Sequence, residues 1–179
     1  KRIIFNGNNY SDEWVKEAEK RGLLNLKTTP EALPYFVAEK NIELFEKHGI
    51  FTEAEVRSRC EIMLENYSKV INIEALTMID MARKDIMPAA VTYTKELAEA
   101  AASKKALLPD VTCEAEEALV TRLSGLCACL YKKTEALEEA LLGVKDYSEA
   151  AETAMYYKDS VLSAMQELRI AADEIETLV

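Results

Sequence analysis

The longest helical pattern in the sequence runs without a glycine from about Thr52 to Ser103. Thr52 and Glu55 have the T-x-x-E spacing of a capping box, which predicts the start of a helix. The apolar residues of this segment fall on more than one helical face, which is typical of a helix at the centre of a bundle. They form two stripes: Cys60, Met63, Tyr67 and Val70, and Ile71, Ala75, Met78, Ala82, Ala89, Tyr93 and Leu97.

Pro88 lies inside this pattern. Because proline has no N–H, it removes the backbone hydrogen bond to the carbonyl of Lys84, and we expect a kink or an interruption there. A packing bend is the preferred interpretation, and a hinge is the alternative.

The composition of the whole chain also favours helices. The chain is 49% hydrophobic and has only 5 Gly and 4 Pro, and its 179 residues are enough for a hydrophobic core. We predict an all-α fold, with a long-helix bundle, a kinked central helix and a C-terminal antiparallel helical hairpin. Residues 1–51 would form a connector with short helices, and residues 52–179 the bundle. The predicted short helices run from Ser11 to Arg21 and from Pro30 to His48, ending at Gly22 and Gly49 respectively.

The last two helices are predicted from leucine-rich seams on either side of the short link "GVKDYS". The first of them starts at Thr112 as its N-cap and ends near Leu142. Lys133 and Lys158 interrupt the two seams at similar distances from the link, so we expect them in one layer, paired with Glu138 or Asp159 or snorkelling apart. The seams are Leu119, Leu123, Leu126, Leu130, Leu137 and Leu141, and Tyr147, Ala151, Ala154, Val161, Met165, Leu168, Ala172, Ile175 and Val179.

The opening stretch "RIIFNGNNYSDEW" has the order strand, glycine turn, helix start that a phosphate-binding loop requires. It has one glycine, Gly7, whereas a dinucleotide fingerprint needs three and a Walker loop needs a Gly-Lys-Ser/Thr ending. We therefore interpret Ser11 as a helix N-cap followed by acidic first-turn residues.

The sequence contains no set of residues that predicts catalysis or metal binding. Its one histidine, His48, has no partner at metal-ligand spacing and is expected at a helix C-terminus. Glu61/Glu65 and Glu135/Glu139 are one turn apart, but no E-x-x-H motif accompanies them, so we interpret them as solvated faces. Four cysteines are expected to be reduced and semi-buried: Cys60, Cys113, Cys127 and Cys129.

The net charge is -10, and residues 109–179 hold 6 Lys/Arg against 15 Asp/Glu. Such a surface repels nucleic acid and anionic lipid, so neither is an expected partner. No apolar run of 18 residues occurs, and we expect no membrane span and no signal peptide. Lys1 stands where a complete chain would begin with Met, and we expect a longer parent chain.

Two long strings resemble the C-terminal region of type III glutamine synthetases. They are "RIIFNGNNYSDEWVKEAEKRGLLNLKTTPEALP" and "EKNIELFEKHGIFTEAEVRSRCEIMLENYSKVINIEALTMIDMARKDIMPAAVTYTKELA". The likeness covers about Lys1 to Ala101, and beyond Ser103 it rests on the expected hairpin. Cys60, where an aromatic residue is expected, and Asn9, where Gly is common, depart from the family's pattern.

The resemblance implies a parent enzyme that makes glutamine from glutamate, ammonia and ATP through a γ-glutamyl phosphate, with Mg or Mn. The catalytic motifs of that family match no position here, so no catalytic, cofactor-binding or metal residue is carried over. The implied role is a structural appendage in the cytoplasm that contacts its own catalytic domain or neighbouring subunits of a homo-oligomeric ring. A stand-alone helical adaptor or regulator is the alternative, and an independent small enzyme is disfavoured by the single His.

Overall fold

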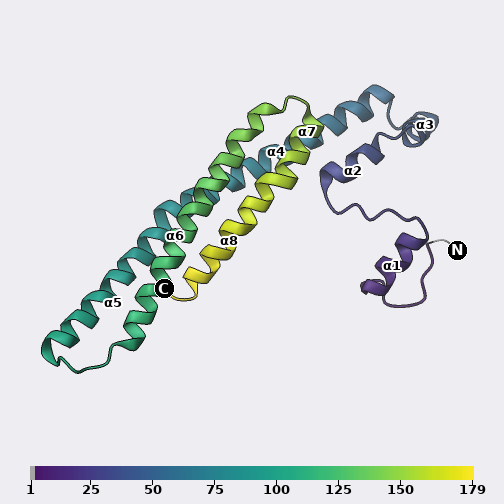
Figure 1. Ribbon diagram of the computed structural model, residues 1–179. Helices are drawn as coiled ribbons and strands as arrows, with labels where there is room; N and C mark the ends of the chain where they lie inside the picture. The colour runs from purple at the N-terminus through teal and green to yellow at the C-terminus, as the bar shows by residue number, and fades with distance from the viewer. Residues whose placement is uncertain (1–2) are drawn as a thin grey trace. The chain divides into compact units, whose positions relative to one another are not determined.

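In a computed structural model, residues 3–179 are described, and every regular element within them is helical. This range contains no strand, and the all-α prediction is confirmed (Figure 1). Lys1 and Arg2, which open the predicted connector, lie outside the described residues. Within residues 3–179 no helix combines the length and the apolar character that crossing a membrane would require.

The chain divides into two compact units, Lys1–Leu64 and Glu65–Val179, and helix α4 contributes to both. The helices that begin in the first unit are α1 (Asp12–Lys20), α2 (Thr29–Phe36), α3 (Glu39–Lys47) and α4 (Glu53–Met81). The second unit continues with a π-helix η1 (Ala82–Ile86), α5 (Met87–Leu107), α6 (Glu114–Gly143), a 3₁₀ turn η2 (Val144–Asp146), α7 (Ala150–Tyr156), a second π-helix η3 (Tyr157–Val161) and α8 (Leu162–Glu176).

Helix α1 begins where the sequence predicts, but its cap differs from the prediction. Ser11 occupies the N-cap position, yet its side chain makes no capping bond to the helix. The Ser11 hydroxyl instead donates to the backbone oxygen of Asn8 at 2.8 Å, within a turn that the Asn8 side chain also supports. Gly22 ends the segment with φ +66°, the left-handed conformation that glycine adopts readily.

The single helix predicted from Pro30 to His48 is wrong, because the chain breaks between α2 and α3. Ala38 is extended, with φ -62° and ψ 141°. The Asn41 side-chain amide donates to the Tyr35 carbonyl at 2.6 Å. The break allows the Phe36 and Phe45 rings to lie 5.8 Å apart. In one straight helix their Cα atoms would be about 13.5 Å apart, so ring packing favours the break.

The capping box at the start of α4 is confirmed. The Thr52 backbone N–H donates to a Glu55 carboxylate oxygen at 2.8 Å, and the Glu55 backbone N–H donates to the Thr52 hydroxyl at 3.4 Å. The Thr52 hydroxyl also donates to this carboxylate, at 2.9 Å, and the backbone and side-chain bonds from Thr52 hold the pKa of Glu55 below its ordinary value.

Thr52→Ala is therefore expected to destabilise the chain by about 1 kcal/mol, measured as a lower urea midpoint of unfolding. The part of the cap supplied by the Glu55 carboxylate is complete above the ordinary glutamate pKa and is lost as the pH falls through the lowered folded pKa. Thr121→Ala is the matched control, because the Thr121 hydroxyl donates to a carbonyl of its own helix on an exposed face. Equal midpoint shifts for the two variants would argue against the cap.

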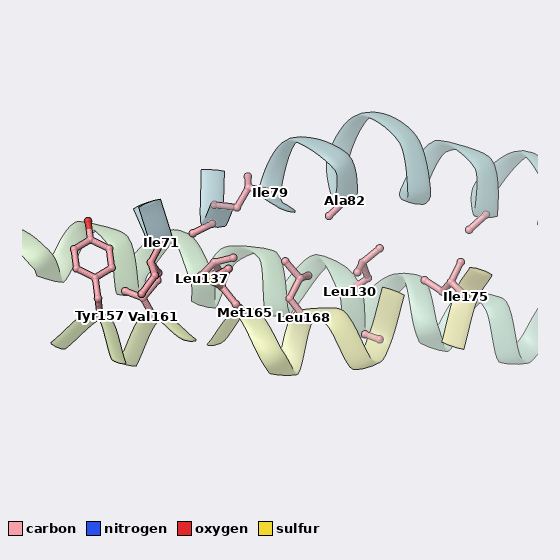
Figure 2. Close-up of a cluster of buried hydrophobic side chains, with 13 residues drawn as sticks. Ile71, Ile79, Ala82, Leu130, Leu137, Tyr157, Val161, Met165, Leu168 and Ile175 are labelled. Carbon is pink, nitrogen blue, oxygen red and sulfur yellow. The ribbon is translucent and has the colours of Figure 1, made fainter. Parts of the chain in front are cut away.

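Within the second unit, α4 buries one face and exposes the opposite one. Ile71, Ala75 and Ile79 are buried, whereas Val70 from the first predicted stripe is exposed. The buried side chains of α4, α6 and α8 form one core, which Figure 2 shows in close-up. Its labelled members are Ile71, Ile79, Ala82, Leu130, Leu137, Tyr157, Val161, Met165, Leu168 and Ile175.

A π-helix lies just before Pro88, at the place where the sequence predicts a kink or an interruption. The Met87 N–H bonds to the Ala82 carbonyl, five residues back, which closes the π-helix η1. Pro88 is the second residue of α5, so its missing N–H falls directly after the π turn, where the backbone bonding pattern changes. The wide turn of η1 also keeps Ala82 and Ala90 both buried although eight residues separate them.

Helix α6 packs against both α5 and α8 (Figure 1). Its N-cap position is Cys113, so the predicted cap at Thr112 is wrong by one residue. The described contacts between α6 and the last helices run in opposite chain directions. Arg122 bonds to Glu174 at 2.8 Å, Lys133 to Glu167 at 2.5 Å, and the Tyr156 hydroxyl to the Ala140 carbonyl at 3.0 Å.

The two lysines do not share one layer. Lys133 pairs with Glu167, whereas Lys158 pairs at 3.1 Å with Asp159, one of the two predicted carboxylate partners. Thr134 and Tyr157 are buried at the seam positions next to the lysines. The Thr134 hydroxyl donates to the Leu130 carbonyl at 2.8 Å, so the core contains no unpaired hydroxyl at this point.

Candidate interaction surface

The residues that the sequence singled out for chemistry lie apart from one another. His48 is exposed at the C-cap of α3, and Cys129 is exposed on α6, which corrects its predicted semi-burial. Cys60 and Cys127 lie further in, and burial raises the pKa of both thiols. Among residues 3–179 no cluster of three or more His, Cys, Asp or Glu side chains could hold a metal ion.

Carboxylates of the predicted acidic pairs take part in ordinary surface contacts. Glu65 bonds to Lys69 at 2.9 Å, one turn along α4. Glu135 accepts a hydrogen bond from the Tyr131 hydroxyl at 2.7 Å, which raises the pKa of Tyr131. Glu138, which was predicted as a candidate partner for the layer of Lys133 and Lys158, forms a two-bond pair with Arg83 instead. These contacts stabilise exposed helix faces and do not converge on a cavity.

The α5–α6 end of the second unit is held by ion pairs between the two helices. Lys104 pairs with Glu116, and Lys105 pairs with Glu117. The hydrogen bond from Lys104 lowers the pKa of Glu116, and the pKa values of both lysines are raised by their partners. Between these pairs, Leu107 and Leu108 are exposed where α5 ends.

A shallow groove of about 320 Å³ lies between the α4–η1 segment and α8. Its polar members lie on α8, where Arg169 pairs with Asp173 at 3.3 Å. Ligand sites usually bring a few polar groups together on a bound molecule. Here Arg169 and Asp173 pair within α8 and most of the lining is apolar, so the groove has the character of a packing surface. Its apolar lining consists of Met78, Met81, Ala82, Ile86, Leu168 and Ala172.

The exposed side of α4 in the second unit is apolar as well. Val70, Ile73 and Leu76 follow one another at intervals of three residues and are 44%, 63% and 52% exposed. Sequence reasoning missed this surface because it assigned Val70 to a buried stripe. The spacing of the truly buried residues Ile71, Ala75 and Ile79 was the signal that separates the two sides. We call Val70, Ile73 and Leu76 the α4 outer face.

The family model for the glutamine synthetase C-terminal domain matches residues 1–105 of this chain. The chain belongs to this family. Glutamine synthetase of Butyrivibrio fibrisolvens is 48% identical over the whole chain, which covers 26% of that protein. Type-3 glutamine synthetase of Dictyostelium discoideum is 33% identical over 99% of the chain and 25% of its own length. Glutamine synthetase of Bacteroides fragilis is 29% identical over 97% of the chain and 24% of its own length.

These comparisons confirm the resemblance to glutamine synthetases and extend it. The likeness to the relatives continues past residue 105 through α6, α7 and α8. The glutamine synthetase C-terminal domain described here spans about a quarter of the length of the curated relatives it matches.

Proposed function

We propose that this chain is the non-catalytic assembly domain of a type III glutamine synthetase. The observation that carries the proposal is the combination of family membership with a helical second unit that leaves apolar side chains exposed on α4 and at the end of α5. Exposed apolar patches on a soluble fold mark contact surfaces. The printed name of the Dictyostelium relative supports the type III assignment.

The parent enzyme, on this proposal, makes glutamine from glutamate, ammonia and ATP in the cytoplasm, with Mg or Mn at its catalytic site. The residues described here do not fit a metal site, because they contain no ligand cluster. We therefore place ATP and metal binding in the part of the parent protein that this chain does not include. The partners of the domain are its own catalytic domain and neighbouring subunits of a homo-oligomeric ring.

The proposal also covers the internal organisation of the domain. Residues 1–51 would lead from the catalytic domain, and residues 52–179 would form the long-helix bundle. The π-helix before Pro88 supports a kink of the central helix. The opposed contacts of Arg122 with Glu174 and of Lys133 with Glu167 support an antiparallel C-terminal hairpin.

Activity and assembly of the natural full-length polypeptide test this proposal. The isolated chain is expected to release no ADP when given glutamate, ammonia, ATP and Mg²⁺, whereas the full-length protein forms glutamine. A variant of the natural protein that ends at Leu64, the last residue of the first unit, is expected to form oligomers of fewer subunits, counted by native mass spectrometry. Glutamate-dependent ADP release by the isolated chain would contradict the non-catalytic role. A truncated protein with an unchanged number of subunits and an unchanged rate would contradict the assembly role.

A further inference from the structure

Helices α5 and α6 extend beyond the end of α8, so their far ends form an arm of two helices (Figure 1). The contact between Arg122 and Glu174 marks the level at which α8 ends, because Glu176 is the last residue of that helix. Past this level, α5 and α6 pack on each other up to the turn that joins them. We call residues 98–122 the α5–α6 arm.

The α5–α6 arm buries few apolar side chains. Among residues 98–122, the buried ones are Ala101 and Cys113. Both side chains are small, and the apolar area that is removed from water is what stabilises packed helices. The next buried residue of α6 is Leu123, and from Leu130 onwards its buried side chains belong to the core that α4 and α8 share.

The other described contacts across the α5–α6 arm are polar. The Cys113 thiol, a weak donor, forms a hydrogen bond to the Ala101 carbonyl oxygen at 3.8 Å. The ion pairs that join Lys104 and Lys105 to α6 contain side chains that are about half exposed. Exposed ion pairs contribute little to stability, because they are solvated and because ordering two long side chains costs entropy. The arm is therefore held less firmly than the core of the second unit.

We infer that the α5–α6 arm opens and closes as a unit of its own while the core of the second unit stays folded. Its helical segments, residues 98–107 and 114–122, depend on each other, because helical stretches shorter than about 12–15 residues are marginal in water without a packing partner. Opening stops at Leu123, since that side chain is fully buried and its exposure would be far more costly. The arm thus gives the domain a part that changes conformation without unfolding the bundle, whether or not the domain has the proposed assembly role.

Hydrogen–deuterium exchange of the natural full-length protein, followed by mass spectrometry, tests the inference. The backbone amides of both helical segments of the arm are expected to share one protection factor, about ten-fold or more below that of residues 130–137 in the core. Equal protection of arm and core would overturn the inference, because the arm would then open only together with the core. Protection that rises steadily from the turn inwards would also overturn it, because the two helix ends would then fray residue by residue.

A pair of glycine substitutions on α6 gives a second readout. Ala118 lies in the arm and Ala136 beside the core, and both are exposed. Because glycine weakens a helix, Ala118→Gly is expected to lower the protection of residues 98–107, on the facing helix, about four- to five-fold. Ala136→Gly is the matched control and is expected to leave that protection unchanged, since the helix around Ala136 stays formed when the arm opens. Equal losses from the two variants, or no loss from Ala118→Gly, would overturn the inference.

Discussion

Leu137→Ala is expected to lower the free energy of unfolding by about 2–5 kcal/mol. Leu137 is fully buried on α6 and belongs to the core that α4 and α8 close (Figure 2). The shortened side chain leaves a cavity that the surrounding helices fill only in part, so the loss exceeds the transfer free energy of the removed carbons. Urea unfolding followed by circular dichroism measures the change.

Leu142→Ala provides the matched control for this prediction. Leu142 lies on the same helix but is 61% exposed, so removing its side chain opens no cavity. Its free energy of unfolding is expected to change by less than about 0.5 kcal/mol. A similar loss for both variants would mean that Leu137 does not occupy the core in solution.

Deletion of Asp85 is expected to cost about 3 kcal/mol, and Pro88 is the reason. Asp85 is exposed in η1, and its removal turns the wide π turn into an ordinary α turn. Ala82 and Ala90 would then be seven residues apart and would still share a face. Pro88 would instead lie inside a continuous helix, where its ring meets the carbonyl four residues back.

Replacing Pro88 by alanine separates this effect from simple loss of a residue. In the deletion background, Pro88→Ala is expected to restore most of the lost stability, measured by urea unfolding. In the chain that keeps Asp85, the same substitution is expected to change the free energy of unfolding little, because Pro88 lies in the first turn of α5. If the deletion costs the same with and without Pro88→Ala, the π-helix does not serve to accommodate the proline.

The features that could be predicted from the sequence are those fixed by neighbouring residues. The capping box at Thr52 and the glycine ends at Gly22 and Gly49 each depend on backbone groups a few residues away. The break at Ala38 could not be predicted in this way. It depends on contact between the Phe36 and Phe45 rings, which exists only after the chain has folded.

The register of α6 against α7 and α8 could also not be predicted from neighbouring residues. Counting outward from the link assumed that both helices begin at equal distances from it, whereas α6 continues to Gly143 and α7 begins only at Ala150. Tyr157 is therefore the buried residue at this point of the seam, and Lys158 beside it pairs with Asp159. The interaction surface was missed for a related reason, since apolar residues on several faces do not reveal which face a neighbour covers.

The ion pairs that join the end of α5 to the start of α6 make the packing of these two helix ends sensitive to ionic strength. Lys104, Lys105 and Glu117 are about half exposed, so dissolved ions reach the charges that join the two helices. The Debye length falls from about 10 Å at 0.1 M to about 3 Å at 1 M, which weakens such exposed pairs. The apolar core around Leu130 does not depend on them. Concentrated salt therefore loosens this end of the bundle while its centre stays closed.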